Sequence, residues 1–174
     1  MRADFLSRVS TLQLHDYRLR PAVFSALDAA WGPHTIDRFA TRDSCQALQP
    51  PHSGRFCALF FHPDAVWTDT FSAPWAGEVN WVFPPVPFVG EAITALRSSG
   101  GPGTLIAPEL RSEVWWPMLR ARTSWAPDIR EVRRLGIAGH VLSHLAVAHG
   151  LRRDTPLLAF RFGGRPGALA VRAP

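Results

Sequence analysis

The sequence predicts an α/β protein with a Rossmann-like, mostly parallel sheet and flanking helices. Short apolar runs that favour strands alternate with amphipathic stretches that favour helices, as in parallel sheets with right-handed crossovers. The apolar run at 79–83 stops at two prolines, which end a strand because proline cannot donate to a sheet ladder. With 174 residues, 47% of them hydrophobic, the chain has the size and apolar content of one such domain.

The domain is predicted to begin with a helix. Residues 1–20 show no sustained period and are interpreted as a leader, which leaves 21–174 as a single domain. Pro21 fits the first turn of a helix, where its missing N–H costs nothing, and Gly32-Pro33 ends that helix. Apolar side chains at helical spacing would bury one face of it: Val23, Phe24, Leu27 and Trp31.

The strands are predicted from apolar runs that stop at turn residues. Residues 34–40 are interpreted as the first strand, with Asp37 near its end, where the carboxylate would accept a hydrogen bond from a ligand or cap residues 40–43. The central strand lies at 79–83, where an open α/β sheet places its ligands outside the strand's carboxyl end. The other predicted strands are a buried run at 56–61 and a run at 104–107.

Two helices are predicted around these strands, and a change of pattern follows. The first helix runs from Pro87 to Ser98, and Ser112 would cap the second, which carries Val114, Trp115, Trp116 and Leu119. Residues 128–134 are expected to form a surface turn or short strand, and 137–149 a helix. The runs at 157–162 and 168–171 predict a C-terminal hairpin or two edge strands.

The charge of the chain is compatible with nucleic acid. The formal net charge is +5, and all 19 basic residues are Arg. Guanidinium groups match phosphates and stack on bases, although a GC-rich gene that replaces Lys by Arg would explain the same composition. No apolar run approaches the roughly 20 residues of a membrane span. Without a secretion signal, the expected location is intracellular, cytoplasmic or nuclear, with Cys45 and Cys57 reduced.

Two residue groups invite a functional interpretation but favour a structural one. His140, His144 and His149 lie near one another on the predicted helix, but the other parts of a helical zinc motif are missing, so no metal is expected. The seven Trp residues would suit base stacking. Because Trp81, Trp115 and Trp116 lie inside patterned segments, core packing is the favoured interpretation.

An ordered set of short motifs resembles a known class of polyprotein. The motifs are 34–41 (HTIDRFAT), 69–72 (DTFS) with Trp75, 81–85 (WVFPP), 103–108 (GTLIAP) and 115–117 (WWP). Over about residues 2–119 the chain looks like the region downstream of ribonuclease H in DIRS-like retroelement polyproteins, which carry reverse transcriptase and tyrosine recombinase. The leader resembles the tail of such a ribonuclease H, in which the residue matching Asp4 is a metal ligand.

That retroelement region is in turn similar to phage-type DNA adenine methyltransferases. The resemblance implies a Rossmann-like sheet that binds S-adenosylmethionine and a signature Asn/Asp-Pro-Pro-aromatic, which holds a flipped adenine. The matching positions here are Phe83, Pro84, Pro85 and Val86. Phe83 cannot accept a hydrogen bond from an amino group, and Asn80, three residues earlier on the strand, points to the other face. Positions implied for the cofactor are Asp37, Phe39 and Asp69.

These departures favour a catalytically degenerate methyltransferase-like domain with a nucleic-acid-associated or structural role in a retroelement-derived protein. The alternatives are an active DNA adenine methyltransferase built on Asp37, Asp69 and the Pro84-Pro85 turn, and a decayed gene fragment. The implied partners are DNA or RNA and other retroelement polyprotein domains, with S-adenosylmethionine as the only implied cofactor. The sequence predicts no oligomeric state.

Overall fold

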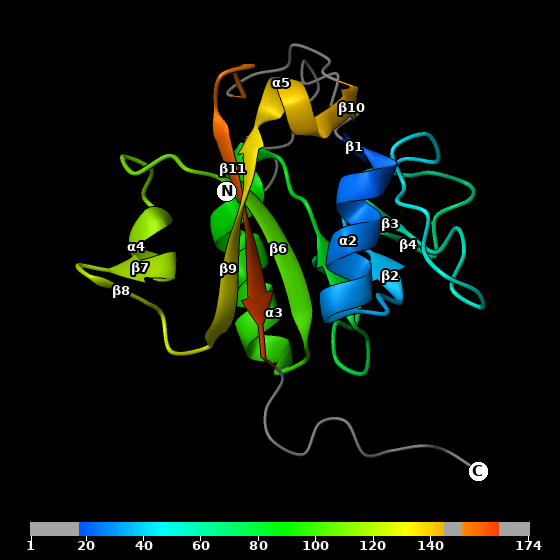
Figure 1. The fold of residues 1–174 in the computed structure, drawn as a ribbon. Helices are drawn as coiled ribbons and strands as arrows, with labels where there is room; N and C mark the ends of the chain where they lie inside the picture. The colour runs from blue at the N-terminus through cyan, green and yellow to red at the C-terminus, as the bar shows by residue number, and fades with distance from the viewer. Residues whose placement is uncertain (1–17, 145–150, 164–174) are drawn as a thin grey trace.

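The computed structural model describes residues 18–144 and 151–163, which form a mixed α/β fold around a five-stranded sheet (Figure 1). The strand order is β2-β5-β6-β11-β9. The strands are β2 (Ile36–Asp37), β5 (Asn80–Val82), β6 (Gly103–Pro108), β11 (Pro156–Phe162) and β9 (Ile129–Ile137). The β2–β5 and β5–β6 pairs are parallel, whereas β11 runs antiparallel to both of its neighbours.

The sheet therefore corrects two expectations. It is mixed rather than mostly parallel, and β11 is an interior strand rather than part of an edge hairpin. Residues 157–160 are apolar and buried on both faces, a pattern typical of an interior strand rather than of an edge strand with one polar face. The edge belongs to β9 instead, which includes the segment interpreted as a turn or short strand. Residues 168–171 lie outside the described residues.

The helix predicted for residues 137–149 is wrong over the described part of that range. The helix α5 (Ala138–Val141) is a single turn, and β10 (Leu142–His144) follows at once. β10 pairs antiparallel with β1 (Arg18–Leu19), so its backbone hydrogen bonds go to another strand and not to a continuing helix. Residues 145–149 are outside the described range.

Two further short strands extend the parallel side of the sheet. β3 (Cys57–Ala58) and β4 (Trp67–Thr68) pair in parallel, and a parallel bridge between Asp37 and Phe56 joins them to β2. The bridge is supported by the Asp37 amide, which donates to the Arg55 carbonyl at 3.1 Å. The buried strand predicted for 56–61 is thus only two residues long. Phe60 and Phe61 lie beyond it, and their side chains are 42% and 83% exposed.

Helices cover the two faces of the sheet. The helix α3 (Val89–Ser99) follows the 3₁₀ turn η1 (Val86–Phe88), and α2 (Pro21–Trp31) lies on the other side of the sheet (Figure 1). The α3 side of the core contains Val82, Leu105, Ala107, Leu158 and Phe160 with Ala92, Ile93 and Leu96. The α2 side contains Trp81, Ile106, Leu157 and Ala159 with Phe24, Leu27 and Trp31. The predicted bounds of α2 are confirmed.

The segment after β6 is more irregular than predicted. α4 (Trp116–Leu119) is a single turn whose N-cap is Trp115, so the expected cap at Ser112 is wrong. A small hairpin of β7 (Arg120–Ala121) and β8 (Ser124–Trp125) follows. Trp115 and Trp116 are buried, and Trp81 on the other face is fully buried, so the core-packing interpretation of these tryptophans is confirmed.

A buried polar bridge ties α2 to the amino end of β6. The ring of His34 is fully buried between Asp28 Oδ1, at 2.6 Å from Nδ1, and Thr104 Oγ1, at 2.8 Å from Nε2. Burial lowers the pKa of His34 despite the opposing hydrogen bond and charge of Asp28. The neutral ring therefore donates a hydrogen bond to Asp28 and accepts one from the Thr104 hydroxyl. Because the ring is fully buried, the bridge is a structural link between α2 and β6.

We expect Thr104→Val to destabilise the fold by about 1–3 kcal/mol, because it leaves one buried ring nitrogen of His34 unsatisfied while nearly preserving volume. The control is Thr94→Val, on the exposed face of α3, which should stay within about 0.5 kcal/mol of the parent. Urea unfolding of both variants measures the two effects. Equal effects of the two substitutions would show that the bridge contributes nothing.

Candidate functional site

A hollow of about 120 Å³ lies outside the carboxyl ends of β3, β2 and β5. These strands end at Ala58, Asp37 and Val82, and the residues just beyond them form most of the wall. The lining consists of Phe39, Ala40, Thr41, Ala58, Leu59, Phe60, Phe61, His62 and Pro85. This is the position where open α/β sheets bind ligands.

The hollow is apolar and bordered by aromatic rings. Phe39 forms part of its wall and contacts Phe71 edge-on, with ring centroids 5.5 Å apart. Phe60 and Phe61 are the exposed part of the lining, and Nδ1 of His62 accepts a hydrogen bond from the Asp64 amide at 3.1 Å. The lining residues named above include no carboxylate and no side-chain amide. Such a wall suits a flat apolar group and offers no acidic acceptor for an amino group.

Of the four signature positions, only Pro85 lines the hollow. Phe83 is buried on the α2 side of the core, in the same cluster as Trp81. Pro84 is buried in the irregular segment that follows β5, and Val86 begins the 3₁₀ turn η1. The strand does end just before the prolines as predicted, but Phe83, which the resemblance matches to a catalytic amide or carboxylate, is part of the core.

The three positions implied for the cofactor do not form one site. Phe39 lines the hollow, but neither Asp37 nor Asp69 does. Asp37 is buried, and its two carboxylate oxygens accept hydrogen bonds from the Phe39 amide at 3.3 Å and the Gln46 amide at 3.1 Å. Burial raises the pKa of Asp37 to about 7, against the effect of these amides. Asp37 therefore stabilises the loop between Phe39 and Gln46 through these two hydrogen bonds.

Asp69 also stabilises a turn in its own segment of the chain. Its backbone has a positive φ of 59°, and its carboxylate accepts a hydrogen bond from the Phe71 amide at 3.3 Å. S-adenosylmethionine carries a charged amino acid, a ribose and an adenine, and a site for it needs polar groups that converge on one cleft. The apolar lining and the engaged carboxylates of Asp37 and Asp69 do not fit this cofactor.

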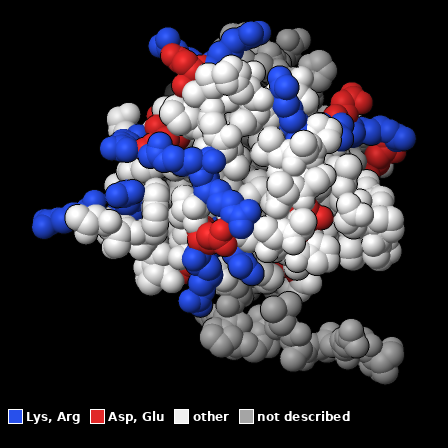
Figure 2. All heavy atoms as spheres, viewed as in Figure 1, with Lys and Arg blue, Asp and Glu red and all other residues white. Residues whose placement is uncertain are grey.

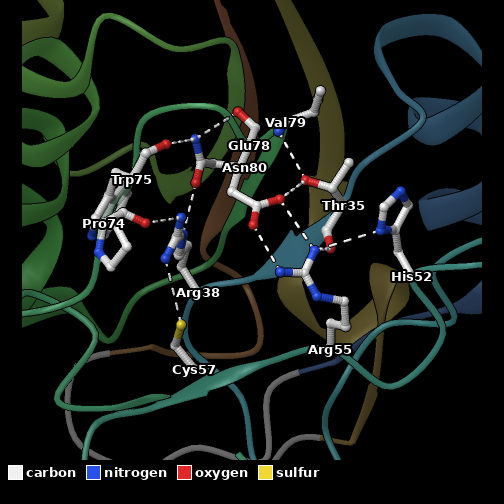
Figure 3. A network of polar contacts seen from close by, with 10 residues as sticks. All are labelled: Thr35, Arg38, His52, Arg55, Cys57, Pro74, Trp75, Glu78, Val79 and Asn80. Carbon is white, nitrogen blue, oxygen red and sulfur yellow. Dashed lines mark hydrogen bonds and ion pairs between the residues drawn. The ribbon is translucent and has the colours of Figure 1, made fainter. Parts of the chain in front are cut away.

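Asn80 takes part in a buried network around Arg38 (Figure 3). Arg38 is fully buried; its Nε donates to Asn80 Oδ1 at 2.7 Å, and Nη2 donates to the Pro74 carbonyl at 2.9 Å. The guanidinium also lies 4.8 Å from the centroid of the Trp75 ring and 3.5 Å from Cys57 Sγ. Burial lowers the pKa of Arg38, while the nearby Cys57 and Glu78 oppose that shift.

The amide nitrogen of Asn80 completes this network. Nδ2 donates to the carbonyls of Trp75, Glu78 and Pro102, each at 3.2 Å. Both ends of the side chain are therefore used to hold the loop before β5 and the start of β6. Both polar atoms of the Asn80 side chain are therefore engaged within the protein, and Asn80 is not among the residues that line the hollow.

A second, partly exposed network lies beside the first (Figure 3). Arg55 pairs with Glu78, with 2.8 Å between Nη2 and Oε1, and donates to the Thr35 carbonyl at 3.0 Å. Thr35 also donates a short hydrogen bond to Glu78. Burial alone would raise the pKa of Glu78, but the hydrogen bonds from Arg55 and Thr35 together lower it. These contacts join the segment before β3 to the start of β2 and β5.

No group of three or more His, Cys, Asp or Glu side chains is placed to hold a metal ion within residues 18–144 and 151–163. His140 lies on α5 and His144 on β10, so these two residues do not share a helix as the spacing suggested. His149 is outside the described residues. The two cysteines are free thiols, and Cys57 is buried. In the same described part of the chain, none of the helices has the length and apolar character needed to cross a bilayer.

Comparison with known proteins adds no family to this description: neither protein-family models nor curated proteins yield a match to the chain.

The pattern at 56–61 predicts one buried strand and therefore does not indicate that its second half lines a hollow. Its first part does pair in the sheet, but Leu59–His62 turns outward and forms the wall of the hollow. A signal was present in the sequence. Phe60, Phe61 and His62 stand directly before Pro63, and a proline does not continue a strand ladder. These three bulky side chains are therefore expected at or beyond the carboxyl end of the strand, where open α/β sheets bind ligands.

Proposed function

We propose that the chain is a catalytically degenerate methyltransferase-like domain of a retroelement-derived protein, with a nucleic-acid-associated role. In this proposal the sheet is retained as a scaffold, and the adenine site at the carboxyl end of β5 no longer supports methyl transfer. The proposal concerns the class of protein and its lack of catalysis, and it requires no cofactor.

The order of the parallel strands supports this proposal. The bridge between Asp37 and Phe56 places the parallel strands in the spatial order β4-β3-β2-β5-β6. Numbered along the chain from β2, this order is 3-2-1-4-5, a strand order that is also found in doubly wound sheets that bind nucleotides. The hollow lies next to β2 and β5, where that order reverses and where such sheets place their ligand.

The observation that carries the proposal is that Phe83 packs in the core and that Asn80 is hydrogen-bonded within the protein. Transfer of a methyl group to adenine needs an acceptor beside the reacting amino group to hold it in place. Phe83 occupies that position and is packed on the α2 side of the sheet, while Asn80 is bonded to Arg38 and three carbonyls. The alternative of an active enzyme is disfavoured because Asp37 and Asp69, its proposed site residues, are bonded to backbone amides.

The proposal predicts that purified, folded protein transfers no labelled methyl group from S-adenosylmethionine to adenine in single- or double-stranded DNA. The measurement is incorporation of tritium above a protein-free control, with circular dichroism to verify the fold. Incorporation that increases with protein concentration would contradict the proposal. The variant Ala58→Phe, which fills the hollow, then distinguishes this site from a contaminating enzyme, since only activity of this site would disappear.

A further inference from the structure

The surface of β9 and β11 on the α2 side carries a group of arginines around one glutamate. Arg161 on β11 stands directly opposite Glu131 on β9, and Arg133 follows two residues along the same strand. Arg130 lies at the register shift near the end of the pair, against Gly163. We call Arg130, Arg133 and Arg161 the arginine strip. Figure 2 shows basic side chains gathered around an acidic one near the middle of this face of the molecule.

Local contacts hold part of the strip in place. Arg133 Nε donates to Glu131 Oε1 at 2.8 Å, and its guanidinium lies 4.8 Å from the centroid of the Trp31 ring. Trp31 Nε1 donates to the other oxygen of Glu131 at 2.9 Å. A Cβ at Gly163 would come within 2.4 Å of Arg130 Nε, so this glycine leaves room for Arg130 to lie along the backbone. Guanidinium groups that are already placed lose less freedom when they bind a ligand.

The strip has an excess of positive charge. The strip has three guanidinium groups, and Glu131 is the carboxylate that pairs with one of them, Arg133; these two side chains remain 41% and 40% exposed. Arg130 and Arg161 are exposed. Hydrogen bonds from Arg133 and Trp31, with the charges of Arg133 and Arg161, lower the pKa of Glu131, so the carboxylate stays ionised and the net charge of the group is that of two cations.

We propose that the arginine strip binds the phosphate backbone of single-stranded DNA or RNA. This inference rests on the nucleic-acid association of the proposed function and assigns a surface to it. Guanidinium forks match phosphate oxygens, and a row of cations on a protein surface can follow the backbone of a single strand. A membrane is the less suitable polyanion. The exposed large apolar residues of the described chain, Phe60, Phe61, Val66, Trp67 and Val114, are not on β9 or β11.

The test is fluorescence anisotropy with labelled 20-nucleotide single-stranded DNA and RNA. The strip variant is Arg130→Glu with Arg161→Glu, which leaves the contact between Arg133 and Trp31 intact. The control is Arg42→Glu with Arg111→Glu, two exposed arginines elsewhere, which changes the net charge by the same amount. Circular dichroism and thermal unfolding verify that both variants are folded.

The proposal predicts that the strip variant binds at least about tenfold more weakly than the parent, whereas the control stays within about threefold. Three phosphate contacts predict that the parent loses affinity by roughly 20-fold between 50 and 200 mM salt, and the strip variant by much less. Equal losses in both variants, or unchanged binding in both, would overturn the strip and leave nucleic-acid association standing.

Absence of any binding by the parent would overturn the nucleic-acid role itself, together with the strip. Vesicles with 30% phosphatidylserine provide the last arm of the test. Binding to these vesicles, weakened in the strip variant and without binding to either oligonucleotide, would overturn the proposal in favour of a membrane surface. The methyl-transfer experiment is independent of all these outcomes, because it tests the lack of catalysis and not the binding.

Discussion

The substitution Asn80→Leu should be among the most destabilising single changes in this protein, at about 3–5 kcal/mol. It keeps the size of the side chain but removes the acceptor of Arg38 Nε, which leaves a fully buried cation with an unpaired donor. It also removes the donor to three carbonyls. The measurement is the free energy of unfolding in urea at pH 7.

A double-mutant cycle with Arg38→Met separates the two contributions. Arg38→Met should cost less than Asn80→Leu, because it removes the buried charge and leaves only neutral acceptors, Asn80 Oδ1 and the Pro74 carbonyl, without a donor. The double variant should then be more stable than the sum of the single effects predicts, by about 0.5–3 kcal/mol. Strictly additive effects, or a larger cost for Arg38→Met, would contradict the view that Asn80 serves to hold Arg38.

The second large effect is the pH dependence of Asp37→Asn. Asp37 is buried with its pKa raised from 3.8 to about 7, so the folded state binds more protons than the unfolded state between these values. Its contribution to the free energy of unfolding therefore falls as the pH rises through this window. The change in the pKa of Asp37 from 3.8 to about 7 corresponds to roughly 4 kcal/mol at most.

The variant has no carboxyl group at position 37 and should lack this dependence. The free energy of unfolding of the variant minus that of the parent should therefore rise by up to roughly 4 kcal/mol between pH 4 and pH 8. The difference is the right quantity because His34, whose pKa is lowered, causes an opposite trend in both proteins: stability that is lost as the pH falls below 6.5. A difference that does not change with pH would show that Asp37 is ionised at little cost.

The parts of the fold that could be predicted are those encoded by local patterns. The helix α2 begins at Pro21 and ends before Gly32, as the proline, the glycine and the spacing of its apolar residues indicated. The strand β5 ends before the prolines, and β6 contains the predicted apolar run. These features depend on backbone chemistry and side-chain period within a few residues.

The parts that could not be predicted depend on pairing between distant segments. An apolar run such as 157–162 is typical of interior strands in both parallel and antiparallel sheets. The run alone therefore does not predict that β11 lies between β6 and β9 or that it is antiparallel to both. β10 forms a strand because β1 offers a partner from the other end of the described chain. In the same way, the role of Asn80 follows from Arg38, which lies 42 residues away.

The most direct test of the proposed loss of catalysis is calorimetric titration of the folded protein with S-adenosylhomocysteine at physiological salt. Because the hollow has an apolar lining and Asp37 and Asp69 are bonded to backbone amides, we predict no saturable heat of binding. Saturable binding with one ligand per chain, lost in the Ala58→Phe variant, would contradict this account. It would show that a cofactor site persists at the carboxyl ends of β2 and β5.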